Sequence, residues 1–267
     1  MPEGDTLART AAGLRPHLVG RTVLAARLLR PGPQVERLVG ARIEAVESVG
    51  KHLLIRSDNG LELRTQLGMR GSWHRYRPGE RWRRPSGRAS LVLEVPGAIA
   101  VCFDAAVVEL YDARAAARHP VLSALGPDLL AAGFDATKAR RRLRDPSRAS
   151  RSIAEALLDQ RALAGIGNVY KNETLWLERV SPFVTVREVD DATLDRLVAT
   201  ARRLMLANVE PSSPPERTTT GSRRRGDGRL WVYGRAGRPC RRCGTLVLGE
   251  RHGDPPRMTH WCPVCQP

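Results

Sequence analysis

The sequence predicts an α+β fold with an N-terminal helix, a β-sandwich, and a helical C-terminal half that ends in a small cysteine-rich module. Short strand-like segments with glycine- and proline-containing turns fill residues 21–112, whereas helical periodicity dominates residues 153–209. Four of the five cysteines lie in the last 28 residues. The chain of 267 residues is long enough for two domains with sizeable cores.

A first helix is predicted at the N-terminus. Asp5 or Thr6 is a suitable N-cap, apolar residues recur at helical spacing from Leu7 to Leu18, and Gly20 provides a stop signal. We expect this helix to anchor the N-terminus to the body of the protein.

The segment that follows alternates between strand-like runs and turns. The predicted strands are residues 21–30, 42–49, 52–56, 61–66, 90–95, 98–103 and 107–111. Turn signals such as Asp58-Asn59-Gly60 separate them, and residues 81–88 form a basic loop. Many short strands with such turns predict a β-sandwich or a barrel.

The C-terminal half begins with a connector, residues 122–150, that contains a short basic helix near 137–143. Helical periodicity then runs from Ile153 to Val209 and ends in a long helix over 192–207. Residues 211–229 are rich in Pro, Ser, Thr, Arg and Gly and have no packing pattern, which predicts a mobile loop.

The charge balance favours a polyanionic partner. Lys and Arg number 44 and Asp and Glu number 28, giving a net charge of +16, which points to nucleic acid. Nearly all the cations are Arg, whose planar fork suits phosphate, although codon bias in a GC-rich genome gives the same preference. The sequence has no apolar run of about 18 residues and no signal-like N-terminus, so we expect a cytoplasmic protein without membrane contact.

The strongest local signal is the pair of motifs Cys240-x-x-Cys243 and Cys262-x-x-Cys265. Eighteen residues separate them, which fits a four-thiolate zinc site. So small a module has almost no core, so bound metal would supply its folding free energy. Residues 245–248 and 258–261 are predicted to pair as a hairpin.

Other readings of the cysteines are possible. A redox CxxC motif usually accompanies a βαβ pattern, which this region lacks, and zinc ribbons also bind proteins. The arginines crowded around this module favour phosphate; they are Arg235, Arg238, Arg241, Arg242, Arg251 and Arg257. Cys102 stands alone in an apolar run and is predicted to be a buried structural thiol.

A second signal is the segment 159–173, where one helix leads into a Gly165-x-Gly167 turn and a second helix begins near Asn168. The free amides at such a helix start can bind phosphate, and the Asn168 side chain can add a donor. An ordinary helical hairpin with glycines in its turn is the alternative.

Two further segments contain candidate DNA contacts. Lys51 follows Gly50 at the head of a strand, where it can clamp a phosphate or simply be a solvated charge. Met69 lies between Gly68 and Gly71 at a strand end. It can form an exposed apolar wedge between bases, or it can be core filler.

The N-terminal residues Pro2 and Glu3 allow covalent catalysis. Removal of Met1 would give Pro2 a free secondary amine, which titrates near pH ~8 and can attack an aldehyde carbon to form an iminium. Glu3 can act as general acid or base. Alternatively, both residues merely open a helix, where a proline and an acid are favourable.

Together these motifs resemble the formamidopyrimidine-DNA glycosylase / endonuclease VIII family of base-excision repair enzymes. The resemblance covers nearly the whole chain and depends on the order and spacing of its motifs. They are Met1-Pro2-Glu3-Gly4, Gly50-Lys51, residues 66–71, residues 159–173 as the helix–two-turn–helix, Val232-Tyr233-Gly234-Arg235, and Arg257-x-Thr259-His260-x-Cys262-Pro263.

The resemblance implies a role for each matching position. Pro2 would be the Schiff-base nucleophile at C1′ and Glu3 the general acid. Lys51, Asn168 and Arg257 would grip phosphates around the lesion. Lys51 and Arg257 would thereby belong to the catalytic centre as well. Met69 would fill the gap left by the flipped base, and one structural Zn²⁺ on Cys240, Cys243, Cys262 and Cys265 would hold Arg257.

The implied reaction is excision of an oxidised base from double-stranded DNA, followed by β,δ-elimination at the abasic site. Base flipping is required because the lesion is otherwise stacked in the duplex. The implied domains are a catalytic β-sandwich (1–120), a linker (121–150), a helix–two-turn–helix domain with a mobile basic loop (151–229) and a zinc finger (230–267). We expect a nucleoid-associated monomer.

The chain departs from the family pattern in two places. Thr6 stands where the family commonly has Glu, and the Arg-Arg-Phe segment that supports the opposite base is not visible in residues 105–114. The opening residues resemble the endonuclease VIII branch, which favours oxidised pyrimidines, whereas Met69 resembles the wedge of the other branch. We predict an endonuclease VIII-like enzyme.

Three alternatives remain open. The chain could be a glycosylase that prefers oxidised purines, or a catalytically silent damaged-DNA-binding protein of the same fold. Only an active enzyme requires the loss of Met1. A zinc-ribbon factor that binds RNA or the ribosome needs only the basic tail, and it leaves Pro2 and Glu3 unexplained.

Overall fold

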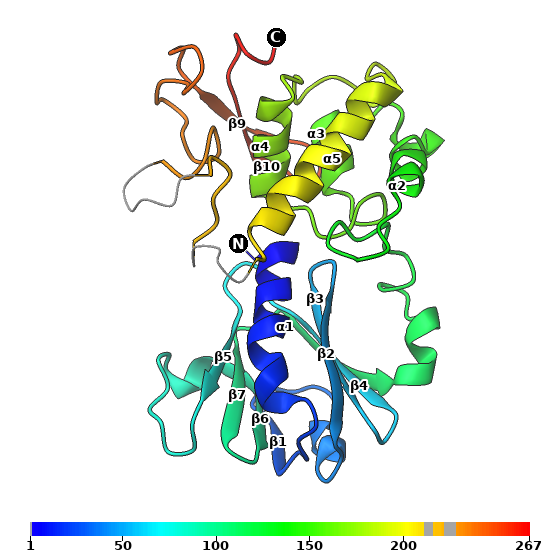
Figure 1. Cartoon of the computed structure of the whole chain (residues 1–267), viewed down its shortest axis with the longest axis vertical. Helices are drawn as coiled ribbons and strands as arrows, with labels where there is room; N and C mark the ends of the chain where they lie inside the picture. The colour runs from blue at the N-terminus through cyan, green and yellow to red at the C-terminus, as the bar shows by residue number, and fades with distance from the viewer. Residues whose placement is uncertain (1, 211–215, 222–227) are drawn as a thin grey trace. The chain divides into compact units, whose positions relative to one another are not determined.

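A computed structural model describes residues 2–210, 216–221 and 228–267. The chain divides into two compact units, Met1–Ala124 and Leu125–Pro267 (Figure 1). The finer four-part division, with boundaries at residues 120, 150 and 229, stays a prediction. Most of the predicted mobile loop, 211–229, lies outside the described residues. Within the described part, no helix combines the length and apolarity that crossing a bilayer requires.

The first unit is a β-sandwich with one helix. Its sheets are antiparallel, with strand orders β1-β6-β7-β5 and β2-β3-β4-β8. The elements are α1 (Gly4–Leu18), β1 (Ala25–Leu28), η1 (Val35–Leu38), β2 (Ile43–Val49), β3 (His52–Ser57), β4 (Leu61–Gln66), β5 (Ser72–Tyr76), η2 (Ser86–Arg88), β6 (Ala89–Val95), β7 (Ala98–Phe103), β8 (Val107–Asp112) and η3 (Ala113–Arg118).

One apolar core joins both sheets to α1. The apolar stripe of α1, from Leu7 to Leu18, packs with side chains of β2, β3, β4, β6 and β7. A smaller cluster around Tyr76 and Phe103 is partly covered by Trp82 from the predicted basic loop. The loop is therefore fixed to the sheet by an aromatic side chain and does not extend freely.

The direction of α1 determines where the N-terminus lies in this unit. The Gly20 amide donates to the Ile43 carbonyl at the start of β2 (2.8 Å), and Arg15 Nη2 donates to the Val46 carbonyl (3.0 Å). α1 is thus antiparallel to β2. Since α1 and β2 are both about 22–23 Å long, the first residues of α1 lie at the same end as the β2–β3 turn (Figure 1).

The structure corrects two predictions for this unit. All seven predicted strands are present, the first shortened to β1, but β5 was missed because glycines and a polar tip precede its short alternating pattern. The N-cap of α1 is Glu3, and the prediction of Asp5 or Thr6 was wrong. Reciprocal hydrogen bonds between Glu3 and Thr6 make the helix begin earlier in the chain than predicted. The spacing of apolar residues does not reveal these bonds.

A polar chain, buried at His52 and Arg64 and half-exposed at Glu109, links β3, β4 and β8. His52 Nδ1 and Arg64 Nη1 are 2.8 Å apart, Arg64 Nε donates to Glu109 Oε2 (2.7 Å), and His119 Nε2 lies 2.9 Å from the same oxygen. Burial, and then the charge of Arg64, lowers the pKa of His52 to about 4. His52 is therefore neutral in the folded protein at neutral pH.

We expect this histidine to make the first unit sensitive to acid. A folded pKa of about 4, against 6.5 for a free histidine, means that protonation disfavours the fold. The free energy of unfolding should be constant above pH 6.5 and fall as the pH drops from 6.5 towards 4. Thermal melts across this range would measure it. His52→Gln should flatten the dependence, and an unchanged slope in that variant would contradict the assignment.

In the part of the second unit that the structure describes there are four α-helices and a C-terminal hairpin. Its elements are α2 (Ala136–Leu143), η4 (Pro146–Arg148), α3 (Ile153–Leu158), α4 (Asn168–Leu177), α5 (Asp191–Ala207), β9 (Leu248–His252) and β10 (Arg257–Trp261). The four helices share one buried apolar core, and the cysteine module has a second small core. The predicted helices near 137–143 and 192–207 are confirmed with bounds shifted by one residue.

The C-terminal hairpin differs from the prediction in its first strand. Residues 248–252 pair with 257–261, whereas the sequence predicted 245–248 paired with 258–261. Thr245 and Val247 instead close the first cysteine turn, because the Thr245 carbonyl accepts from Cys240 N (2.7 Å) and Val247 N donates to Arg238 O (3.0 Å). The geometry of the CxxC turn outweighs the local strand pattern.

Candidate nucleic-acid-binding site and metal centre

Pro2 and Glu3 form the entrance to α1. Pro2 is half-buried, and Glu3 is completely buried at the N-cap position. A reciprocal capping box holds Glu3, because its side chain accepts from the Thr6 amide and its own amide is 3.5 Å from Thr6 Oγ1. Thr6 thus makes the capping contact that Glu or Gln usually makes at this position. The Glu3 carboxyl is fixed immediately beside Pro2.

Lys51 lies in the two-residue turn that joins β2 to β3. Val49 pairs directly with His52, so Gly50 and Lys51 are the only turn residues. Gly50 has φ +57°, which suits glycine at the first central position of such a turn. Lys51 is half-buried. It therefore lies in the tight turn at the end of the hairpin, one residue before β3 begins. The sequence had placed it at the head of that strand.

Met69 sits at the apex of the β4–β5 connection. Its side chain is 64% exposed, which excludes the core-filler interpretation. Gly68 has φ +61°, and a Cβ on Gly71 would lie 2.3 Å from the Leu67 carbonyl oxygen. Both glycines are therefore required by the tight shape of this apex, residues 67–71, which we call the Met69 tip.

The three features lie at one end of the first unit. His52 at the start of β3 pairs with Gln66 at the end of β4, which places the Lys51 turn beside the Met69 tip. The N-terminal end of α1 lies at the same end of β2 as the Lys51 turn. The unit thus places Pro2, Glu3, Lys51 and Met69 at one end.

In the second unit, the turn before α4 is held by Gln160. Its Nε2 donates to the carbonyls of Leu158 and Ile166, both at 3.0 Å, and its Oε1 accepts from Gly165 N (3.1 Å). The N-cap of α4 is Gly167, which has no side chain to occupy the first amides of the helix. This arrangement is suited to binding a phosphate.

α4 is joined to β10 by side-chain bonds. Asn168 Nδ2 donates to the Met258 carbonyl (2.8 Å), and Asn172 Oδ1 accepts from His260 N (2.6 Å). These bonds bring the exposed Arg257, the residue before Met258, to the start of α4. One Asn168 N–H is therefore used to position the Arg257 strand, a second function beside the predicted phosphate contact.

Sequence reasoning missed two buried charges on α4. Lys171 is 1% exposed, and its Nζ donates to Thr259 Oγ1 (2.8 Å). Together with Arg257 it lines a cavity of about 340 Å³. Lys171 lies in the motif 159–173, but local spacing did not reveal its distant partner Thr259.

The second missed charge is Glu173, which is fully buried. It accepts the backbone N–H groups of Trp231 (2.7 Å), Val232 (2.9 Å) and Tyr233 (2.8 Å). This carboxylate fixes the chain segment that leads into the cysteine module. The signal for this role was the presence of an acidic residue within a helix that is otherwise buried.

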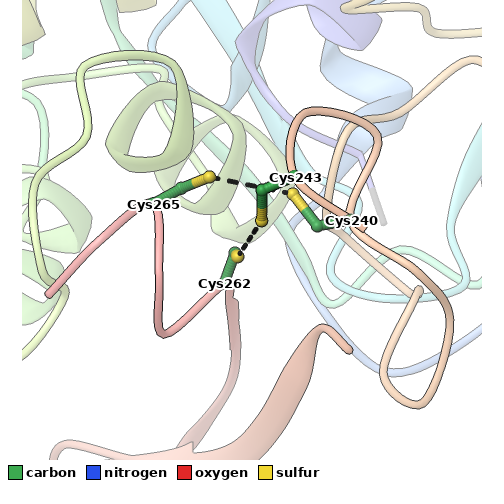
Figure 2. Close-up of side chains that lie close together, drawn as sticks. All are labelled: Cys240, Cys243, Cys262 and Cys265. Atoms are coloured by element: carbon green, nitrogen blue, oxygen red, sulfur yellow. Dashed lines mark hydrogen bonds between the residues drawn. The ribbon is translucent and has the colours of Figure 1, made fainter. Parts of the chain in front are cut away.

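The four C-terminal cysteines converge on one point. Their sulfurs lie within 4.8 Å of one another, with 3.4 Å between Cys243 and Cys262 and 4.0 Å between Cys240 and Cys265. Figure 2 shows the side chains pointing towards each other from two loops. A tetrahedron with metal–sulfur bonds of about 2.3 Å has S–S edges of about 3.8 Å. The cluster can therefore hold one metal ion.

Two thiols of this cluster differ in acidity. Hydrogen bonds from Thr245 lower the pKa of Cys243 to about 6, whereas burial raises the pKa of Cys265 to about 12. A bound cation would favour the thiolate form of all four. The cluster also adjoins α4, because Trp176 stacks on Trp231 at 4.7 Å and Arg242 lies 4.0 Å above the Trp176 ring.

Comparison with known proteins gives a consistent result along the chain. Residues 1–118 match the formamidopyrimidine-DNA glycosylase N-terminal domain, and residues 125–218 match the formamidopyrimidine-DNA glycosylase H2TH domain.

Full-length relatives are also similar. Endonuclease 8 2 of Mycobacterium tuberculosis is 43% identical, with all of both chains covered. The DNA-(apurinic or apyrimidinic site) lyase Nei2 of Mycolicibacterium smegmatis is 41% identical, covering 100% of this chain and 99% of the relative.

Among solved structures, Lactococcus lactis Fpg (MutM) in complex with DNA containing N7-benzyl-Fapy-dG shares the fold. The TM-score is 0.84 at 23% identity, over 99% of each chain. The matched domains and the full-length relatives together show that the chain belongs to the formamidopyrimidine-DNA glycosylase / endonuclease VIII family, in its endonuclease VIII-like branch.

Proposed function

We propose that this protein is a bifunctional DNA glycosylase and abasic-site lyase of base-excision repair. Its substrate would be double-stranded DNA that contains an oxidised base, foremost an oxidised pyrimidine, or an abasic site. The observation that carries the proposal is the fixed, fully buried Glu3 immediately beside Pro2, at the end of the unit where Lys51 and Met69 also lie.

Chemistry at Pro2 requires that Met1 be removed, because only then is its nitrogen a free amine. The neutral amine would attack C1′ of the damaged nucleotide while the N-glycosidic bond breaks, giving an iminium between Pro2 and the opened sugar. Glu3 would protonate the ring oxygen as the sugar opens. The iminium acidifies the C2′ proton, and loss of that proton expels the 3′ phosphate. A second elimination would expel the 5′ phosphate.

The remaining site residues would bind the DNA. Lys51, Arg257 and Asn168 would contact phosphates around the lesion, and the amides at the start of α4 would add donors. Met69 would occupy the space left by the flipped nucleotide. A DNA partner would also fit the net charge of +16.

The cysteine cluster would hold one structural Zn²⁺, bound by Cys240, Cys243, Cys262 and Cys265. The ion would stabilise the module that carries β9 and β10 and so keep Arg257 in place. The protein would associate with the nucleoid, where its DNA substrate lies, and we propose that it acts as a monomer.

Borohydride trapping tests this function. The protein, with Met1 removal verified by intact mass, is mixed with duplexes that contain an abasic site, an oxidised pyrimidine, or 8-oxoguanine opposite each base. Borohydride reduces the iminium to an amine, whose C–N bond links the protein stably to the DNA. We expect a trapped band with the abasic site and the oxidised pyrimidine, and no band when the Pro2 amine is blocked.

Each outcome discriminates between the alternatives. A stronger band with 8-oxoguanine would favour a purine-preferring glycosylase. No band with any duplex, in processed protein that still binds DNA, would favour a catalytically silent damage-binding protein. A band that persists when the Pro2 amine is chemically blocked would exclude Pro2 as the nucleophile.

A further inference from the structure

The Met69 tip accepts a hydrogen bond from a side chain that lies outside residues 67–71. Arg84, in the loop between β5 and β6, donates from Nη1 to the Arg70 carbonyl oxygen at 3.0 Å. The same Nη1 lies 3.2 Å from Asp104 Oδ2, in the turn between β7 and β8. One guanidinium therefore connects the residue next to Met69 to a turn on a different part of the sandwich.

Asp104 is in turn fixed by a second arginine. Arg88 Nε is 3.0 Å and Nη2 is 2.7 Å from Asp104 Oδ2, and this hydrogen bonding lowers the pKa of the carboxyl. Asp104 also has φ +47°, a left-handed conformation that is uncommon for residues other than glycine. The anchoring carboxylate is thus held both by its backbone conformation and by its ion pairs.

The same turn packs against the other side of the tip. A Cβ on Gly68 would lie 2.9 Å from Ala106 Cβ, and Ala106 N donates to the Gln66 carbonyl (2.8 Å). Residues on both sides of Met69 are therefore fixed, while Met69 itself is 64% exposed. An apolar side chain so exposed on a constrained apex is expected to insert only if its backbone is already in place.

We propose that Arg84 and Asp104 are positioning residues that hold the Met69 tip ready for insertion into the DNA duplex. The inference depends on the proposed function, because it assumes that Met69 replaces a flipped nucleotide. Exposed ion pairs contribute little to stability individually. Arg84 is 31% and Asp104 19% exposed, so this contact is expected to act mainly on geometry.

The alternative is that Arg84 binds a DNA phosphate directly. Its Nη1 is already shared by a carbonyl and a carboxylate. The two roles have different signatures, because loss of a phosphate contact reduces the salt dependence of binding by a slope of about 0.9, whereas loss of a positioning contact leaves that slope unchanged.

The test is a double-mutant cycle between Arg84→Met and Met69→Ala. The first readout is the fluorescence of 2-aminopurine placed opposite an oxidised pyrimidine, at saturating protein. The second is the single-turnover excision rate. We expect Arg84→Met to reduce both, with excision falling about 10- to 100-fold, at unchanged salt slope and melting temperature. Asp104→Asn, which tolerates the left-handed backbone, should have a smaller effect in the same direction.

Two controls make the result specific. Arg83→Met removes a neighbouring arginine of the same loop whose side chain reaches the Arg75 carbonyl (3.4 Å) and lies over the Tyr76 ring (5.5 Å), and it should retain the normal signal. In the Met69→Ala background, Arg84→Met should cause no further loss, because both act through one tip.

Additive losses, a reduced salt slope or a normal 2-aminopurine signal in Arg84→Met would overturn the positioning role. Normal excision by Met69→Ala would overturn the wedge assignment and with it the role of Arg84. The glycosylase itself would stand as long as the trapped Pro2 band is present.

Discussion

Replacing Glu3 by glutamine is expected to reduce base excision by about 10²- to 10⁴-fold, the usual range for loss of a positioned general acid. Glutamine keeps a carbonyl oxygen that can accept the Thr6 amide, so the capping box and α1 should persist. It cannot deliver a proton to the opening sugar. Single-turnover excision from an oxidised-pyrimidine duplex would measure the loss, and the affinity for an uncleavable abasic analogue should stay within about threefold of the parent.

Glu47→Gln is the matched control for this prediction. Glu47 lies on β2, is half-exposed and pairs with Arg56 at 3.0 Å, so the same chemical change occurs at the surface of the same unit. Its excision rate should be normal. If Glu3→Gln excises bases at the parent rate, Glu3 is not the general acid. If it loses DNA affinity and melts early, its role is structural.

Removing the metal is expected to have the second large effect. The module around the four thiols has only a small apolar core, and binding of structural zinc contributes about 10–16 kcal/mol in small zinc modules. Without it, the loops that carry Cys240 and Cys262 should separate and β10 should lose its fixed position. Chelation, or Cys262→Ser, should abolish one equivalent of bound zinc and weaken DNA binding at least as much as Arg257→Ala.

The loss of DNA binding in Arg257→Ala is the reference with which the effect of metal removal is compared. It should weaken binding across all sequences and reduce the salt slope by about 1, as expected for one phosphate contact. Cys102→Ala is the control for loss of a thiol, because Cys102 is buried in the core of the first unit, whereas the cluster belongs to the second. It should retain one zinc. Full zinc content in Cys262→Ser would contradict the four-thiolate site.

Much of the fold could be predicted because the relevant signals are local. Strand alternation and turn residues located seven of the eight strands of the sandwich, and helical spacing located α2 and α5 to within one residue. The exception, β5, is five residues long and follows the glycines of the Met69 tip, so its alternating pattern is too short to separate from a loop.

The candidate site was predictable to a different degree in each unit. The CxxC spacing identified the metal ligands, because two tight turns can each supply two sulfurs to one ion, and the sulfurs do converge. The position of Lys51 beside Met69 depended on the pairing of His52 with Gln66, which connects residues fourteen apart along the chain. Local periodicity does not specify that register.

The family, the nucleophile and acid candidates, and the cysteine ligands could be read from the sequence, since these depend on residue types at fixed short spacings. The bond between Asn168 and Met258, and the contacts of Arg84 with Arg70 and Asp104, are visible only in the folded chain. These contacts join residues 14 to 90 positions apart. Their formation depends on the global packing of apolar surfaces, which brings together polar groups that no local pattern pairs.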